Sequence, residues 1–276
     1  MQVAEESSIH APAWRGGRRL AEALDSGLAA WRRSAKAASV AGLAGTAGLI
    51  LVRVQLVGRL ALGSDMRLHL TAGMNLLGWL AAGGGLLLAL LAFGWTLRLL
   101  PVSRPSLLAS LRTALRRFPA LLVAMLIYLV LTLGLPFLAG LLAGGRWMLV
   151  LAAMLTLEVV ALWLSVSLIF HPFAVMEHDA GPLAALNASH RRVRGRWWWS
   201  LLGTSVATTV PVLLYLGVTV VTGGLLGAWR LVGGGPAWLD TLNWLVQWLV
   251  GGFLFPMGPA LLAGLWWSLA DEAQPR

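Results

Sequence analysis

The sequence predicts an all-α membrane protein, and two observations carry that prediction. Hydrophobic residues make up 58% of the 276 residues and charged residues only 12%, which is typical of polytopic membrane proteins rather than soluble domains. The hydrophobic residues gather into six long runs, at 38–58, 72–97, 119–143, 147–170, 200–226 and 240–269. Each run is about 20 residues or longer, enough for a helix to cross a hydrocarbon core of roughly 30 Å. Backbone amides in lipid must be paired within the segment, so the runs are predicted to be six transmembrane helices.

The six runs are predicted to form one bundle of three hairpins. A single membrane domain is expected over 18–276, after a disordered polar arm over 1–17, because no connection is long enough to fold by itself. The first run starts too late and is too long to be the core of a cleavable signal peptide. The chain has no cysteine, which excludes disulfides and cysteine metal sites.

The basic residues predict how the bundle is oriented. Of the 21 Lys and Arg residues, 16 lie in the N-terminal arm, the second and fourth connections and the C-terminal end. Positively charged loops stay in the cytoplasm, so both termini are predicted to be inside, in a multi-pass protein of a bacterial inner membrane. The same distribution argues against a nucleic-acid partner, because that role needs a basic soluble domain.

Three basic amphipathic helices are predicted beside the spans, over 18–36, 104–118 and 181–197, one before each hairpin. Their apolar stripes are Leu20, Leu24, Leu28 and Trp31; Leu107, Leu111, Leu115 and Phe118; and Leu183, Leu186, His190, Val193 and Trp197. Spacings of three and four place each stripe on one helical face. Such helices lie in the membrane plane with their cations among lipid phosphates. The second and third units match at an offset of 75 residues, so the chain is predicted to repeat one unit three times.

Tryptophans cluster near the predicted ends of the spans. Trp95, the triplet 197–199, Trp266 and Trp267 lie near the inner boundaries. Indole prefers the headgroup level, so we interpret these residues as interface anchors. A platform for an aromatic substrate is the alternative.

The segment 173–197 resembles a bacterial membrane-protein family. Its pattern is an apolar–Glu–Gly/Pro turn, an Ala-Leu…Ser helix and a basic–Gly–aromatic entry into the fifth span. The matching positions are Glu177, Gly181, Pro182, Ala185, Leu186, Ser189, Gly195 and Trp197. The pattern is similar to that of YciC-like inner-membrane proteins and of the membrane domain attached to some glycerophosphodiester phosphodiesterases. The tail from Pro256 to Leu269 resembles the closing segment of that family, without its usual Tyr, Asp and Arg. The resemblance implies six spans and little chemistry, since this chain has no phosphodiesterase domain.

Glu158 is the only carboxylate deep in a predicted span. A charge there costs about 2.5–3.5 kcal/mol on insertion scales, so Glu158 is expected to be protonated, paired or in contact with water. One hypothesis is proton coupling or cation binding on a transport path. The other is a structural tie to Arg53, Asn75 or Gln247.

Glycine and proline interrupt several runs. The predicted helix breaks are Pro136, Pro211, Gly251, Gly252 and Pro256. Broken spans expose backbone at the substrate sites of transporters, and the sixth run is the best candidate for such a break. The alternative is close helix packing, for which the pairs Ala81/Gly85, Gly140/Gly144 and Ala260/Gly264 have the required spacing.

No catalytic constellation is visible in the sequence. The histidines lie outside the predicted spans, and the aspartates at 65, 179, 240 and 271 lie in connections or at run ends. This placement disfavours an intramembrane protease. His171, Glu177, His178 and Asp179 are interpreted as solvated loop residues rather than metal ligands, because adjacent side chains do not converge on one ion. We therefore expect no enzyme activity, no cofactor and no metal.

Two functions remain open. The first is binding or transport of a lipid, a hydrophobic small molecule or an ion. The second is an accessory, permease-like or scaffold role with a protein partner at the cytoplasmic face. Either function would use exposed arginines, as anchors for anionic lipid headgroups or as a docking surface for a protein. The candidate residues are Arg112, Arg116, Arg117, Arg191, Arg192, Arg194 and Arg196. Transport predicts a polar cavity reaching Glu158, whereas a scaffold predicts a dry bundle with Glu158 paired.

Overall fold

The computed structural model describes residues 15–57, 60–62, 68–70, 76–101, 106–134, 147–233 and 238–271. These residues are mostly helical: α1 (Arg15–Val57), α2 (Leu76–Leu99), α3 (Leu107–Leu129) with a π-helical turn η1 (Val130–Gly134), α5 (Trp147–Leu168), α6 (His171–His178), α7 (Pro182–Val193), α8 (Trp197–Gly233), α9 (Trp238–Leu254) and α10 (Met257–Asp271). Two short strands, β1 (Leu60–Leu62) and β2 (Leu68–Leu70), pair antiparallel with Ala61 opposite His69. The all-α prediction is therefore right except for this small ladder in the first connection.

Six helical segments of the described chain are long and apolar enough to cross a membrane: Arg19–Val52, Gly78–Leu99, Leu107–Gly134, Thr156–His178, Trp197–Trp229 and Thr241–Leu269. Their outer faces expose large apolar side chains, as at Val220, which is 70% exposed, and Leu225, which is 67% exposed. Apolar surface of this extent is unfavourable in water and compatible with lipid. The prediction of a multi-pass membrane protein is confirmed at this level.

α1 joins two elements that the sequence analysis separates. The predicted interfacial helix 18–36 and the predicted span 38–58 form one helix that starts at Arg15 and continues to Val57. No proline lies in this stretch to remove a backbone donor and stop the helix. Residues 1–14 of the predicted arm lie outside the described residues.

α3 likewise runs through the predicted boundary between interfacial helix and span. Pro119 lies inside it, and the helix ends in the π-helical turn at Gly134. By contrast, the predicted helix 181–197 stops at Val193. Gly195 has a φ of 84° in the turn before α8, a conformation that glycine adopts without steric cost.

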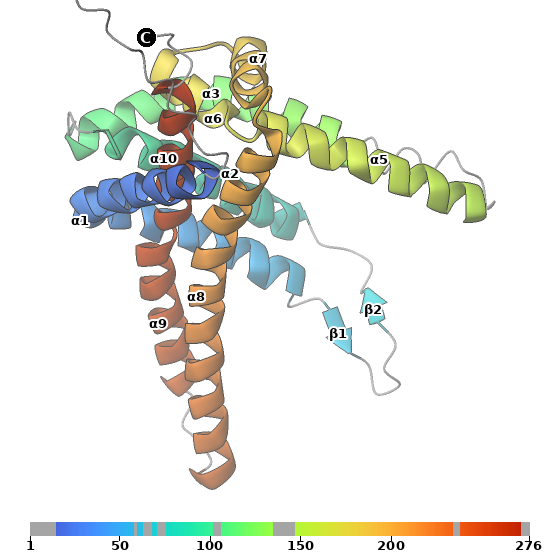
Figure 1. Ribbon diagram of the computed structural model, residues 1–276. Coiled ribbons are helices and arrows are strands. Elements are labelled where there is room, and N and C mark those ends of the chain that lie inside the picture. The colour runs from blue at the N-terminus through green and yellow to red at the C-terminus, as the bar shows by residue number, and fades with distance from the viewer. Residues whose placement is uncertain are drawn as a thin grey trace, which may run out of the picture.

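α1 is the central packing element. It contacts α2, α9 and α10, while α8 and α9 run side by side and α5 extends away from the other helices (Figure 1). Glycines permit the close approach: a Cβ on Gly48 would lie 2.3 Å from the Gly85 carbonyl oxygen, and one on Gly264 would lie 2.1 Å from the Ala23 carbonyl oxygen. The prediction of close helix packing at Ala260/Gly264 is confirmed, because Ala260 faces Gly27 of α1 in the same way.

The apolar stripe of α1 packs on protein rather than on the membrane surface. Leu20 is buried, and Leu24, Leu28 and Trp31 pack against the main core. The Trp31 ring meets Phe253 of α9 edge to face, with centroids 4.9 Å apart. The expectation of a surface-lying helix is therefore wrong for this stripe, because α9 and α10 offer an apolar partner that the sequence does not reveal.

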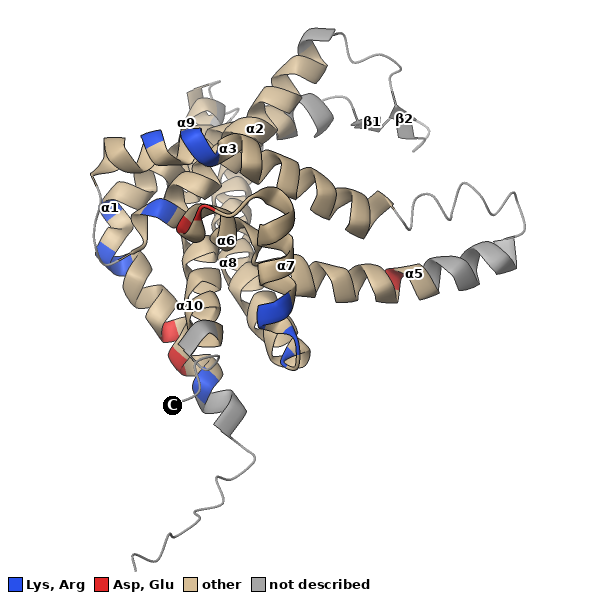
Figure 2. Cartoon of the chain, turned by 90° about the horizontal axis from the view of Figure 1, so that it is seen from above, with Lys and Arg blue, Asp and Glu red and all other residues tan. Residues whose placement is uncertain are grey.

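The tightest packing lies where α6, α7 and α10 meet. Phe170, Phe173, Met176 and Trp266 are each at most 1% exposed, and so is His171. The interpretation as solvated loop residues is wrong for His171, which is buried, and for Glu177, which is partly buried, because both lie in α6. It holds for exposure at His178 and Asp179, at the end of the helix. Pro172 lies in the first turn of α6, and the apolar residues that follow pack against α10. Basic residues surround this end, on α1, on α3 and around α7 (Figure 2).

Two of the predicted interface tryptophans are core residues. Trp266 is 1% exposed and Trp95 is 7% exposed. The Trp95 indole donates to the Leu107 carbonyl at 3.2 Å, which ties α2 to the start of α3. The anchor interpretation is therefore wrong for these two.

The sixth predicted span is broken where the sequence analysis places a break. α9 ends at Leu254 and α10 begins at Met257. Pro256 lies between them and has no N–H to donate to the helix, and the Phe255 amide closes the last turn of α9 on the Gly251 carbonyl at 2.7 Å. The prediction for Pro256 is confirmed.

Three other predicted breaks do not interrupt a helix. Gly251 and Gly252 lie inside α9, and Pro211 lies inside α8. The glycines serve packing instead, because a Cβ on Gly252 would lie 2.4 Å from the Leu43 side chain of α1. Pro136 lies outside the described residues.

Candidate functional site

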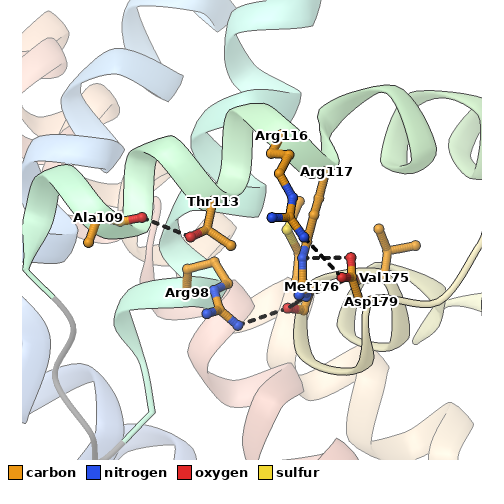
Figure 3. A network of polar contacts seen from close by, with 8 residues as sticks. All are labelled: Arg98, Ala109, Thr113, Arg116, Arg117, Val175, Met176 and Asp179. Carbon is orange, nitrogen blue, oxygen red and sulfur yellow. Dashed lines mark hydrogen bonds and ion pairs between the residues drawn. The ribbon is translucent and has the colours of Figure 1, made fainter.

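Four arginines from two helices line one pocket of about 380 Å³, which we call the arginine pocket. Its lining residues are Arg98, Arg112, Thr113, Arg116 and Arg117, and Figure 3 shows all of them except Arg112. Arg98 lies in the last turn of α2, and the other four share one side of α3, because Arg112 and Arg116, like Thr113 and Arg117, are four positions apart. Ser106 caps α3 by accepting the Ala109 amide at 3.2 Å, which fixes where this face begins.

The carboxyl end of α6 positions two of these arginines. Arg98 donates to the Met176 carbonyl at 2.9 Å, and Arg117 donates to the carbonyls of Val175, at 3.2 Å, and Met176. The last carbonyls of a helix lack intrahelical partners and carry partial negative charge. Two guanidinium groups are therefore held side by side on one carbonyl oxygen, an arrangement that their mutual repulsion opposes.

Asp179 is the one carboxylate paired with the arginine pocket in the described chain. Its Oδ2 lies 3.2 Å from Arg116 Nη2 and its Oδ1 lies 3.0 Å from Arg117 Nε. Asp179 ends α6 with a φ of 55°, a left-handed conformation that Asp and Asn adopt more readily than other side chains. The Arg117 side chain is only 13% exposed, so its ion pair is better shielded than that of the exposed Arg116.

A second polar cluster, the Glu177 clamp, joins α6, α7 and α10. Glu177 accepts the Trp266 indole N–H at 2.7 Å and the Trp267 indole N–H at 2.8 Å. The Arg192 guanidinium carbon lies 3.4 Å from the centroid of the Trp266 ring, within cation–π range. Burial lowers the pKa of Arg192, and the Glu177 carboxylate partly offsets that effect.

Ser189 ties α7 to the end of α5 and to the residue before α6. Its hydroxyl donates to the Ser167 carbonyl at 2.9 Å and accepts the Phe170 amide at 3.1 Å. Several residues that carry the family resemblance thus hold helices together: Glu177 joins α6 to α10, Ser189 joins α7 to the end of α5, and Ala185 is buried in the core. These contacts give a structural reason for the residue pattern of the segment 173–197. The same pattern marks Glu177 as a structural residue, which its interpretation as a loop residue did not recognise.

An apolar groove of about 420 Å³ lies between α1, α8, α9 and α10. Its lining residues are Thr46, Leu49, Ile50, Ala207, Thr208, Pro211, Val212, Tyr215, Leu216, Gly251, Leu254, Phe255 and Gly258. Pro211 and Gly251, two of the predicted breaks, line the groove. The residues on either side of the break at Pro256, Phe255 and Gly258, line it as well. Because Val212 and Leu216 are about half exposed, the groove opens toward the outer face of α8.

Glu158 lies on α5 and belongs to neither cavity. Its side chain is exposed, and no residue in the described ranges forms an ion pair with it. Gln247 is buried on α9, where its amide donates to Asn243 Oδ1 at 3.2 Å. The side chain of Arg53 and all of Asn75 lie outside what the structure describes. Of the three proposed partners only Gln247 has a described side chain, and it bonds within α9 rather than to Glu158; the expected pairs with Arg53 and Asn75 lie outside the described residues.

The remaining predicted headgroup cations separate into two groups. Arg191 and Arg194 are exposed and Arg196 is partly buried, at the end of α7 and in the turn before α8. Arg192 faces Trp266 instead of a headgroup, and Arg117 binds the end of α6. Within the described ranges, no group of three His, Asp or Glu residues is arranged to hold a metal ion.

Comparison with known proteins finds no match to this chain among family models, curated proteins or solved structures. The resemblance to YciC-like proteins therefore stays a prediction from the residues quoted above.

Proposed function

We propose that this protein is a non-catalytic membrane protein that binds a lipid or a hydrophobic small molecule in the apolar groove. One observation carries the proposal: the groove has a volume of about 420 Å³ and a lining that is mostly aliphatic and aromatic. Ligand pockets range over roughly 300–1,000 Å³ and are lined mainly by apolar side chains with a few polar groups. Transport of the bound molecule is the extension of this role that the break at Pro256 favours.

The groove suits a ligand that arrives from the bilayer. Its opening lies beside the exposed apolar face of α8, at Val212 and Leu216. Thr46, Thr208 and Tyr215 add the only polar side chains to its lining. An ion would leave most of this surface without a partner, so the groove favours an apolar occupant over an ion.

We further propose the finer membrane arrangement: three hairpins with both termini on the cytoplasmic side of a bacterial inner membrane. The support is the concentration of basic residues in alternate connections. Reporter fusions after Gly195 and after Gly233 test it, with cytoplasmic and periplasmic signals expected respectively.

Native mass spectrometry of the purified protein tests the binding role. Gly258 lies in the groove, where a Cβ would meet the Ala207 carbonyl oxygen at 3.6 Å and nothing closer. The Cβ of a residue at position 258 therefore makes no clash, and the leucine side chain of Gly258→Leu is expected to occupy the groove. Gly217→Leu is the matched control, because a Cβ on Gly217 meets nothing within 4 Å.

The wild type and Gly217→Leu are expected to retain a specific lipid or hydrophobic molecule that Gly258→Leu loses. Equal retention by both variants would contradict the groove as the binding site. The absence of any specifically retained molecule in the wild type would contradict the function itself.

A partner-docking role is the second candidate, and the surface of α7 favours it. Leu183 is 71% exposed there, and Arg191 on the same helix is exposed. Arginine is enriched at protein interfaces, and an exposed leucine on the same helix adds apolar surface for a partner to bury. Site-specific photo-crosslinking at Leu183 in cells would give a discrete adduct if α7 docks a partner and none if it does not.

A further inference from the structure

We propose that the arginine pocket is a binding site for a phosphate-bearing anion. The pocket is separate from the apolar groove, so the proposal does not depend on the function proposed above. It goes beyond a general attraction of basic helices to anionic membranes, because it assigns a defined cavity, built from α2 and α3, to one anionic group.

The first argument is charge. Four guanidinium groups line the pocket, and one carboxylate, that of Asp179, is paired with them in the described ranges. The local excess is thus three positive charges. The guanidinium groups repel one another at this distance, and an anion bound among them lowers that repulsion.

The second argument is the supply of unused donors. Arg112 is exposed and makes no hydrogen bond or ion pair with any described residue. The Nε of Arg98 is buried without a hydrogen-bond partner. A guanidinium group offers five N–H donors in a planar fork that matches phosphate oxygens, so Arg98, Arg112 and Arg116 together supply the donors that a phosphate group needs.

The third argument is preorganisation. Arg98 and Arg117 are held on the α6 carbonyls, and Arg116 on Asp179 (Figure 3). Fixed donors bind an anion without the entropy cost of ordering long side chains. Asp179 acts as an internal counterion. It orients Arg116 when no anion is bound, and it competes with a bound anion for the Arg116 guanidinium group.

Three variants distinguish binding at this defined pocket from a general attraction of the basic surface for anions. Asp179→Asn removes the charge and keeps a side chain that tolerates the left-handed φ. Arg112→Gln removes a cation that makes no hydrogen bond or ion pair within the described residues. Arg191→Gln removes an equal charge from exposed α7 and is the matched control.

The probe is dioctanoyl phosphatidylglycerol, titrated into the full chain in neutral detergent and followed by native mass spectrometry. Arg112→Gln is expected to weaken binding about tenfold, which is the effect of losing one charge-assisted hydrogen bond. Arg191→Gln is expected to leave binding within about twofold of the wild type, since exposed charges at a distance are screened. Asp179→Asn is expected to tighten it.

Two further arms identify the source of the phosphate. Dioctanoyl phosphatidylcholine, which has no net charge, is expected to bind more weakly than phosphatidylglycerol. Competition by sn-glycerol 3-phosphate would assign the site to a soluble phosphate ester, and a lack of competition would assign it to the lipid headgroup. Equal losses in Arg112→Gln and Arg191→Gln, or no loss in either, would overturn the proposal.

Discussion

The Glu177 clamp makes a sharp prediction about stability. Glu177 accepts two indole N–H groups, at 2.7 and 2.8 Å, and lies beside the Arg192 guanidinium on the Trp266 ring. Glu177→Gln is nearly isosteric but replaces one acceptor oxygen by an NH₂ group. One indole N–H then faces a donor, and the negative charge near Arg192 is lost.

The size of the effect follows from these contacts. The two distances lie in the range of charge-assisted hydrogen bonds, each worth about 1.5–3 kcal/mol. Trp266 is 1% exposed, so its N–H cannot turn to water and is expected to keep the remaining oxygen. The loss therefore falls on the more accessible Trp267. We expect Glu177→Gln to lower the free energy of unfolding by about 2–3 kcal/mol, and the midpoint by roughly 4–10 °C.

Thermal unfolding in detergent, followed by tryptophan fluorescence, measures this change. Glu158→Gln is the control, because it makes the same substitution at an exposed carboxylate of a candidate span; it is expected to leave the midpoint unchanged or to raise it, since it removes a charge that is costly in lipid. In a Trp267→Phe background, Glu177→Gln is expected to cost less, since the affected bond is already absent. Equal midpoints for Glu177→Gln and Glu158→Gln would refute the reasoning.

Three glycine substitutions are also predicted to act in a defined direction. Gly264→Ala brings a Cβ to 2.1 Å from the Ala23 carbonyl oxygen and is expected to lower stability by about 3 kcal/mol by separating α1 from α10. Gly83→Ala, whose Cβ meets nothing within 4 Å, is expected to be neutral or to stabilise α2 by up to about 1 kcal/mol. Gly195→Ala forces alanine to a φ of 84° and is expected to cost about 1–2 kcal/mol. Melting midpoints of purified variants check each value, and a Gly264→Ala midpoint at or above that of Gly83→Ala would contradict the packing argument.

The candidate sites were predictable only in part. Arg112, Arg116 and Arg117 follow from the basic face of one helix, but Arg98 joins them only because α2 and α3 meet at the end of α6. The groove gathers residues from α1, α8, α9 and α10, which no local pattern connects. Glu158 drew attention because a charge in lipid is costly, yet it lies apart from both cavities.

The sequence by itself determined that the chain is helical and apolar enough for six membrane crossings, and that the last run bends at Pro256. Those properties follow from backbone hydrogen bonding in lipid and from the missing amide of proline, which act locally. Only the tertiary structure decided which faces meet: that the stripe of α1 packs on α9 and α10, that α6 is a buried helix, and that Glu177 holds two tryptophans. In a chain whose surface and core are both apolar, hydrophobicity does not distinguish a lipid-facing residue from a buried one, so the close approaches at glycine and the hydrogen bonds of indole and carboxylate decide the arrangement.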